Sequence, residues 1–307
     1  MKNFNIDFFG KKRTFFTISL VILAIGIVFN VIFGTKMDVQ FAGGAVIKYN
    51  VTDEVSQEEV QKIVKDALGR DCSVTTNKVI SNGENQVTVT FAGNEGITVE
   101  DQKTVATALS ENYADVSFEV AESSSVDPTM GAKFFQKCIV CFGITVIFLL
   151  IYIALRFKKI GGLAAGVTAV IALVHDVLIV YFVFVIFKMN INDIFIAVIL
   201  TIIGYSLNDT IVIFDRIREN KRLHGKDDYP TVINLSLNQT MTRSIITSLT
   251  TFIVLLVVYI VALVYGLTTV TSFALPMMIG VVSGCYSSLV IAAPLYGMWE
   301  MKQANKQ

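Results

Sequence analysis

Charge is scarce in this sequence. Only 16% of its 307 residues are charged, where a soluble protein carries about a quarter, and the formal net charge is zero. A nucleic-acid-binding protein needs a basic surface, and a disordered chain needs low hydrophobicity with high net charge, so the composition excludes both classes. With 53% hydrophobic residues and a mean hydropathy of +0.63, the composition also excludes a water-soluble globular protein.

Histidine and cysteine are also scarce. Two histidines are too few for a histidine-based zinc site, and four cysteines do not make a disulfide framework. Cys138 and Cys141 have the spacing of a redox motif, but they lie in an apolar run, which favours a packing role. No nucleotide-binding loop or catalytic nucleophile is recognisable. We therefore predict no metal, no cofactor and no enzymatic activity.

Apolar residues, in contrast, lie in long blocks. The hydrocarbon core of a bilayer is about 30 Å thick and takes about 20 residues of helix. We predict an α-helical polytopic membrane protein with six transmembrane helices. These are residues 14–34, 134–155, 160–187, 194–214, 244–267 and 270–298.

Lysine and arginine in short connections mark the cytoplasmic side of a membrane. They concentrate before the first predicted helix, between the second and third, after the fourth and at the carboxyl end, whereas the opposite side offers Lys188 in its one charged short loop. Both termini are therefore predicted to be cytoplasmic. Residues 1–13, the loop 215–243 and the tail 299–307 would lie inside, and residues 35–133 outside.

The predicted outer segment is acidic, with 16 Asp and Glu against 8 Lys and Arg. Its hydrophobic spacing predicts strands and helices in the order βαββαβ, which is the order of a ferredoxin-like α+β domain. The predicted strands are 39–41 continuing at 45–49, 72–80, 86–91 and 116–120, and the predicted helices are 56–68 and 99–113.

Three short signals refine this outer domain. Ser56 followed by Glu59 predicts a capping box at the start of a helix. Asn82–Gly83 predicts a hairpin turn. Ser123–Ser125 is polar and is expected to be a hinge before the second transmembrane helix.

Ionisable side chains inside apolar helices cost roughly 2.5 to 3.5 kcal/mol each at a helix centre and usually mark ion pathways. Here Asp209 lies beside Asn208 in the fourth predicted helix, and Arg243 opens the fifth. We expect Asp209 and Arg243 to pair. The pair could be a proton switch, in which protonation of Asp209 releases Arg243, or a static link between helices.

Helical spacing extends these residues into polar stripes, which we expect to face each other or a hydrated interior. The stripes are Thr201, Tyr205, Asn208 and Asp209 in one helix, and Thr240, Arg243, Thr247 and Thr251 in the next. His175 and Asp176 lie mid-helix in the third predicted span. With Thr247 they are candidate relay residues, although His175 and Asp176 could equally form a hydrogen-bonded knot that fixes packing.

The last predicted helix has a structural pattern. Gly280, Gly284 and Ser288 recur every four residues, a spacing of small residues that lets helices approach closely. Pro276 and Pro294 are expected to kink this helix.

Several motifs resemble one known family. The run from Gly204 to Asn220, GYSLNDTIVIFDRIREN, is similar to the signature of the SecF family of protein-export membrane subunits. Further similarities cover nearly the whole chain, at residues 7–13, Phe41–Gly44, 152–157 and 238–248. Two departures are Gln40, where the family usually has Asp, and Asp127, where Gly usually precedes the proline. The first weakens an ion-binding role for the outer motif of Phe41, Gly43 and Gly44.

The resemblance implies membership of the resistance-nodulation-division superfamily, in which two six-helix halves form a transporter. The other half would be SecD, and the pair would use a proton or sodium gradient to pull an extended preprotein across a prokaryotic cytoplasmic membrane, after the SecYEG channel and SecA. Membrane lipids are a further expected partner, and no nucleic acid is expected to bind. The resemblance places the coupling carboxylate at Asp209 and an essential arginine at Arg243.

Alternatives remain at this point. The same fold could serve as half of an exporter for small molecules or lipids, or as a scaffold that transports nothing. The outer domain could bind preprotein as an added strand at a sheet edge, or it could contact only its SecD counterpart.

Overall fold

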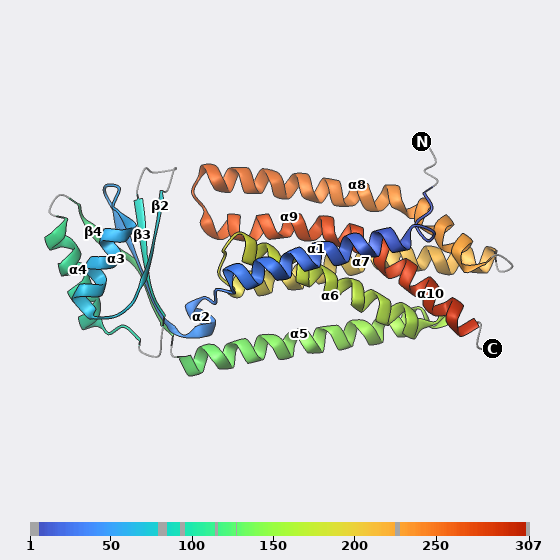
Figure 1. Cartoon of the computed structure of the whole chain (residues 1–307), viewed down its shortest axis with the longest axis horizontal. Coiled ribbons are helices and arrows are strands. Elements are labelled where there is room, and N and C mark those ends of the chain that lie inside the picture. The colour runs from blue at the N-terminus through green and yellow to red at the C-terminus, as the bar shows by residue number, and fades with distance from the viewer. Residues whose placement is uncertain are drawn as a thin grey trace.

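A computed structural model of the chain describes residues 6–78, 85–92, 96–113, 116–126, 128–224 and 228–304. The Asn82–Gly83 turn signal and Asp127 lie outside these residues. The described residues form a long helical bundle with a smaller unit, built around a sheet, at one end (Figure 1).

Six helical segments among the described residues are long and apolar enough to cross a membrane, which confirms the prediction of six apolar helices. They comprise α1 (Lys12–Phe33), α5 (Pro128–Arg156), α6 (Gly162–Ile186), α7 (Asp193–Leu223), α8 (Tyr229–Val264), and a last segment of α9 (Thr268–Ser287), a π-helical turn (Ser288–Ala292) and α10 (Ala293–Ala304). A 3-10 turn (Lys158–Ile160) joins α5 to α6.

The predicted loop 215–243 is mostly helical, so this part of the prediction is wrong. Hydropathy marks only the apolar part of a helix, whereas α7 and α8 continue past it with polar side chains that bind one another. Arg216 forms an ion pair with Glu219 at 2.6 Å, and Asn220 donates to Ser236 across the two helices at 2.9 Å.

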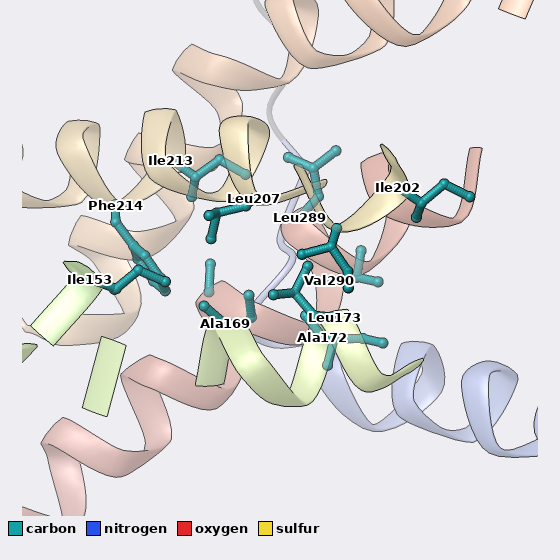
Figure 2. Packing of buried hydrophobic residues seen from close by; sticks show 14 of the residues in the cluster. Ile153, Ala169, Ala172, Leu173, Ile202, Leu207, Ile213, Phe214, Leu289 and Val290 are labelled. Atoms are coloured by element: carbon teal, nitrogen blue, oxygen red, sulfur yellow. The ribbon is translucent and has the colours of Figure 1, made fainter. Parts of the chain in front are cut away.

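The interior of the bundle lies between α6, α7 and the last segment. Figure 2 shows its packing, with Ala172 and Leu173 of α6 near Leu289 and Val290 of the π-helical turn. By comparison, α1, α5 and α8 are peripheral and expose rows of large apolar side chains. This distribution suits a membrane, because lipid solvates apolar side chains as well as a protein core does.

Small residues bring α9 close to α7, as the spacing predicted. A β-carbon on Gly280 would lie 1.9 Å from Cδ1 of Ile202, and one on Gly284 would lie 3.0 Å from Cβ of Ser206. The π-helical turn lies just before Pro294, whose missing N–H interrupts the helical hydrogen bonds. Pro276, in contrast, lies inside α9, and the kinks expected at the two prolines stay predictions.

The smaller unit has the element order βαββαβ. Its elements are β1 (Gly44–Val51), α3 (Gln57–Leu68), β2 (Ser73–Lys78), β3 (Asn85–Ala92), α4 (Val99–Asn112) and β4 (Phe118–Val126). The strands form an antiparallel sheet in the order β2-β3-β1-β4. Alternate residues of β1, including Ile47 and Tyr49, are buried in a core shared with Val60 and Val64 of α3 and Val105 of α4.

Three local predictions in this unit are wrong. Residues 39–42 form the short helix α2 (Val39–Ala42) rather than a strand. Ser56 makes no side-chain capping bond, and the capping box is instead at Thr98 and Asp101, before α4. Ser123–Ser125 is no hinge, because these residues pair with β1 as part of β4. Serine hydroxyls suit an exposed strand as well as a loop, so composition alone did not distinguish the two.

The amino-terminal residues are fastened to α8. The side-chain amide of Asn238 both donates to the carbonyl of Ile6 and accepts its N–H, each at 2.8 Å. One turn away, Asn234 accepts the N–H of Phe9 at 2.9 Å and donates to Asp7 at 2.7 Å. The start of the chain therefore holds the end of α8 that is remote from the sheet (Figure 1).

Candidate ion-coupling site

Asp209 lies half-buried between α7 and α8. The hydroxyl of Ser244 donates to its Oδ1 at 2.5 Å. Its Oδ2 is buried and has no hydrogen-bond partner among the described residues. One turn along, the hydroxyl of Tyr205 donates to Ser248 at 3.0 Å. The two helices thus meet through two polar contacts, one helical turn apart. The second carboxylate oxygen of Asp209 has no hydrogen-bond partner in these contacts.

Arg243 is exposed on α8. The expected ion pair of Arg243 with Asp209 is absent from the ion pairs of the described residues, so that expectation is wrong for this arrangement. The reason is helix geometry. Since Ser244 points at Asp209, its neighbour Arg243 is directed about 100° around the helix. A rotation of α8 would exchange the two side chains.

The five other members of the predicted stripes differ in exposure. Thr201, Asn208 and Thr247 are exposed, Thr251 is half-buried, and Thr240 is buried. The hydroxyl of Thr247 donates to the backbone carbonyl of Arg243 at 2.8 Å. Thr201 and Asn208, seven residues apart, share one face of α7, and Arg243 and Thr247, four residues apart, share one face of α8. Lipid is a poor solvent for such polar faces.

A second polar cluster surrounds Asp176 in the bundle interior, where Asp176 is 1% exposed. Three hydroxyls donate to its carboxylate: Ser206 of α7 at 2.7 Å, and Ser283 and Ser287 of α9 at 2.6 and 2.7 Å. The sequence reasoning missed these serines. The spacing of Ser283 and Ser287 by four residues was the available signal.

His175 stands at the edge of this cluster. Its Nδ1 lies 3.3 Å from Oδ1 of Asp176, and its ring lies against that of Tyr286 with centroids 6.3 Å apart. Nε2 is buried and has no hydrogen-bond partner in the described part of the chain. The cluster continues through Thr210, whose hydroxyl is 2.7 Å from that of Ser288.

The two clusters share α7. Ser206 belongs to the Asp176 cluster and Asp209 follows it by three residues, about one helical turn. A rotation or shift of α7 therefore acts on both carboxylates at once. Across the described residues, no group of three or more His, Cys, Asp and Glu side chains is placed to hold a metal ion.

The outer motif is far from these carboxylates in the fold and has a packing role. Phe41 is 4% exposed, and its ring lies 5.6 and 5.4 Å from those of Phe134 and Phe135 in α5. Gly43 and Gly44 have φ angles of 81° and 128°, which favour glycine. A β-carbon on Gly44 would also lie 2.1 Å from the carbonyl oxygen of Phe91. The motif joins the sheet to α5.

Comparison with known proteins decides the family. Residues 105–302 match the family described as protein export membrane protein SecD/SecF, C-terminal. This chain belongs to the SecD/SecF family. It is 30% identical over 308 residues to the protein translocase subunit SecF of Endomicrobium trichonymphae, with 100% of this chain and 94% of that protein covered. It is 33% identical to SecF of Thermobaculum terrenum, with 97% and 95% covered.

Longer members of the SecD/SecF family contain a region similar to this chain. The protein translocase subunit SecDF of Bacillus subtilis is 33% identical over 305 residues, which cover 98% of this chain and 39% of that protein. The crystal structure of SecDF from Thermus thermophilus, a translocon-associated membrane protein, superposes with a TM-score of 0.81 at 26% identity. It covers 97% of this chain and 39% of the other. The chain is thus a SecF-like, multi-pass membrane subunit.

Proposed function

We propose that this chain is the SecF subunit of a SecD–SecF complex that couples an ion gradient to late steps of preprotein export. Family membership supports the export role. One observation supports the coupling: Asp209 lies between two membrane helices with one oxygen held by Ser244, the other unused, and Arg243 on the adjacent face.

The coupling step follows from the energetics of this carboxylate. A buried charged oxygen without a donor is costly, and a protonated carboxyl group at the same position costs less. In the arrangement described here, Ser244 faces Asp209 and a proton neutralises it. When α8 rotates, Arg243 faces Asp209 and stabilises the ionised form. Proton binding and release therefore select between two positions of α8, and one charge crossing 100 mV supplies about 2.3 kcal/mol.

SecD is the proposed partner on the polar surface of α7 and α8. The match spans 39% of the SecDF proteins, so they carry a second part outside the region that matches this chain. A facing helix with polar side chains would cover Asn208, Arg243 and Thr247, which lipid solvates poorly. SecYEG, SecA and an extended preprotein are the further proposed partners.

The orientation and the outer unit complete the proposal. The lysines and arginines near the helix ends support cytoplasmic termini and an extracytoplasmic sheet unit in the cytoplasmic membrane. The order βαββαβ and the antiparallel sheet β2-β3-β1-β4 support a ferredoxin-like domain.

The decisive experiment is translocation of a preprotein into membrane vesicles with an imposed pH gradient or sodium gradient. Asp209→Asn keeps the shape of the side chain but cannot titrate, so we expect it to lose the gradient-driven part of translocation. Asp193→Asn is the matched control, because Asp193 is a carboxylate at the end of the same helix. We expect that control to translocate like the wild type. Full activity of Asp209→Asn would refute the coupling role, and the effective gradient identifies the ion.

A further inference from the structure

An apolar groove of about 660 Å³ lies between α5 and the neighbouring helices α6 and α7. It is separate from the Asp209 and Asp176 clusters. Its volume is that of an ordinary ligand pocket. From α5 it is lined chiefly by Lys137, Cys138, Cys141 and Phe142, and from the other helices by Val177, Leu178, Tyr181, Phe195, Ile196, Ile199 and Leu200.

The groove exists because α5 is held closely at its two ends. Toward the end remote from the sheet, Gly162 and Gly166 let α6 approach the backbone of α5, where a β-carbon on Gly162 would lie 2.0 Å from the carbonyl oxygen of Ala154. At the sheet end, the ring of Phe41 packs against those of Phe134 and Phe135. Between these two contacts the helices stand apart, and the space opens sideways toward the membrane, past the exposed side chain of Ile139.

From its place in α5, we expect Lys137 to lie at the level of the lipid headgroups. It precedes Arg156, near the other end of α5, by 19 residues (156 minus 137), or about 28 Å of helix. That length is close to the hydrocarbon thickness of a bilayer, about 30 Å. On α5 the lining runs from Phe135 to Phe142, so we expect the groove to lie just under the headgroups of the leaflet next to the sheet unit.

The lining identifies the occupant. Apolar walls disfavour water, and a groove open to the bilayer is in contact with acyl chains. Lys137 is the one charged side chain of the lining, and it takes part in none of the ion pairs found among the described residues. A cation above an apolar groove at this depth complements a phosphate above an acyl chain.

We propose that this groove binds an anionic phospholipid, with its phosphate on the ammonium group of Lys137 and an acyl chain between α5 and α7. A helix of the SecD partner fits less well. The polar residues of α7, which a protein partner would satisfy, lie on another face of that helix from Phe195, Ile196 and Ile199. The inference does not depend on ion coupling.

The test uses the full chain, produced with its SecD partner and placed in nanodiscs of phosphatidylglycerol or phosphatidylcholine. A photoreactive phosphatidylglycerol with a diazirine in its acyl chain should label the peptide around residues 138–142. We expect Lys137→Gln to reduce this labelling about five-fold, the effect of about 1 kcal/mol for one lysine at an anionic surface. Lys188→Gln is the matched control, a lysine beyond the end of α6 that lies over Phe33, and should leave the labelling unchanged.

A second variant tests the groove itself. Leu178 is 37% exposed, so Leu178→Trp fills the space without disturbing the interior, and it should abolish labelling with either headgroup. Labelling that is equal for phosphatidylcholine and insensitive to Lys137→Gln would overturn the proposal. So would labelling that persists in Leu178→Trp, or crosslinking of Cys138 or Cys141 to SecD in place of lipid.

Discussion

Asp209 is half-buried and Asp176 is buried, and their carboxylates differ in the number of hydrogen bonds they accept. Asp176 accepts three hydroxyls within 2.7 Å, whereas Asp209 accepts one and leaves Oδ2 unused. A fully bonded carboxylate stabilises one arrangement of helices, and a partly bonded one can exchange partners. The geometry therefore favours a packing knot at Asp176 and a switch at Asp209.

This contrast predicts different mutant behaviour. In Asp176→Asn the amide cannot accept all three hydroxyls, so we expect a loss of about 1 to 3 kcal/mol in stability, seen as a lower thermal unfolding temperature in detergent. Asp209→Asn should unfold near the wild-type temperature while losing gradient-driven transport. An Asp176→Asn protein with unchanged unfolding temperature and lost transport would show that His175 and Asp176 form a relay instead.

At this scale the sequence identified the charged residues but not their surroundings. A charge in an apolar run is conspicuous, so Asp176, Asp209 and Arg243 were found. Ser283 and Ser287 were not, because serine is common at helix contacts. Which of Arg243 and Ser244 faces Asp209 depends on the rotation of α8, and no local pattern specifies that rotation.

Among the elements, α5 and α6 pack so closely that no side chain fits at one position of their contact. The backbone of α5 at Ala154 touches Gly162, so a side chain there must displace backbone rather than another side chain. A β-carbon on Gly143 of α5, in contrast, would have nothing within 4 Å. The helix pair thus contains Gly162, which has no space for a side chain, and Gly143, which has ample space.

The prediction is that Gly162→Ala destabilises the chain by about 1 to 3 kcal/mol through overpacking. Gly143→Ala should be neutral or slightly stabilising, because alanine favours helix over glycine. Thermal unfolding of the two variants in detergent measures the difference. Equal unfolding temperatures would mean that α5 does not pack on α6 in this way.

Element identity followed from periodicity, but element ends did not. Apolar runs located every membrane helix, and yet α7 and α8 extend into polar sequence because Asn220 and Ser236 bind each other there. Residues 39–42 alternate like a strand but form α2, because the Phe41 ring is buried against α5. Contacts between residues distant in sequence determine the ends of α7 and α8 and the helical conformation of residues 39–42. Local residue spacing does not predict such contacts.

For the whole molecule, the sheet unit presents β4 as an edge strand. It pairs with β1 on one side only, and its residues from Glu119 to Ser125 are exposed. An unpaired edge is a template for another extended chain. The two alternatives for this unit, preprotein capture and contact with SecD, therefore concern the same edge.

Photocrosslinkers separate the two alternatives. Placed at Val120, which is 49% exposed, a crosslinker should capture a stalled preprotein if strand addition occurs, because backbone pairing requires no particular sequence. The matched site is Thr75 in β2, at the opposite edge of the sheet, and capture there in place of Val120 would assign strand addition to β2. Adducts at Val120 that contain only SecD would rule out strand addition.

One connection determines how the two parts of the molecule can move. β4 ends at Val126 and α5 begins at Pro128, so a single residue separates a strand from a helix of 29 residues. Because the two elements are so close in sequence, we expect a rotation of the sheet unit to be transmitted to α5. The pivot of this rotation would be the tight backbone contact at Gly162. In that case α5 would transmit movement from one membrane surface to the other.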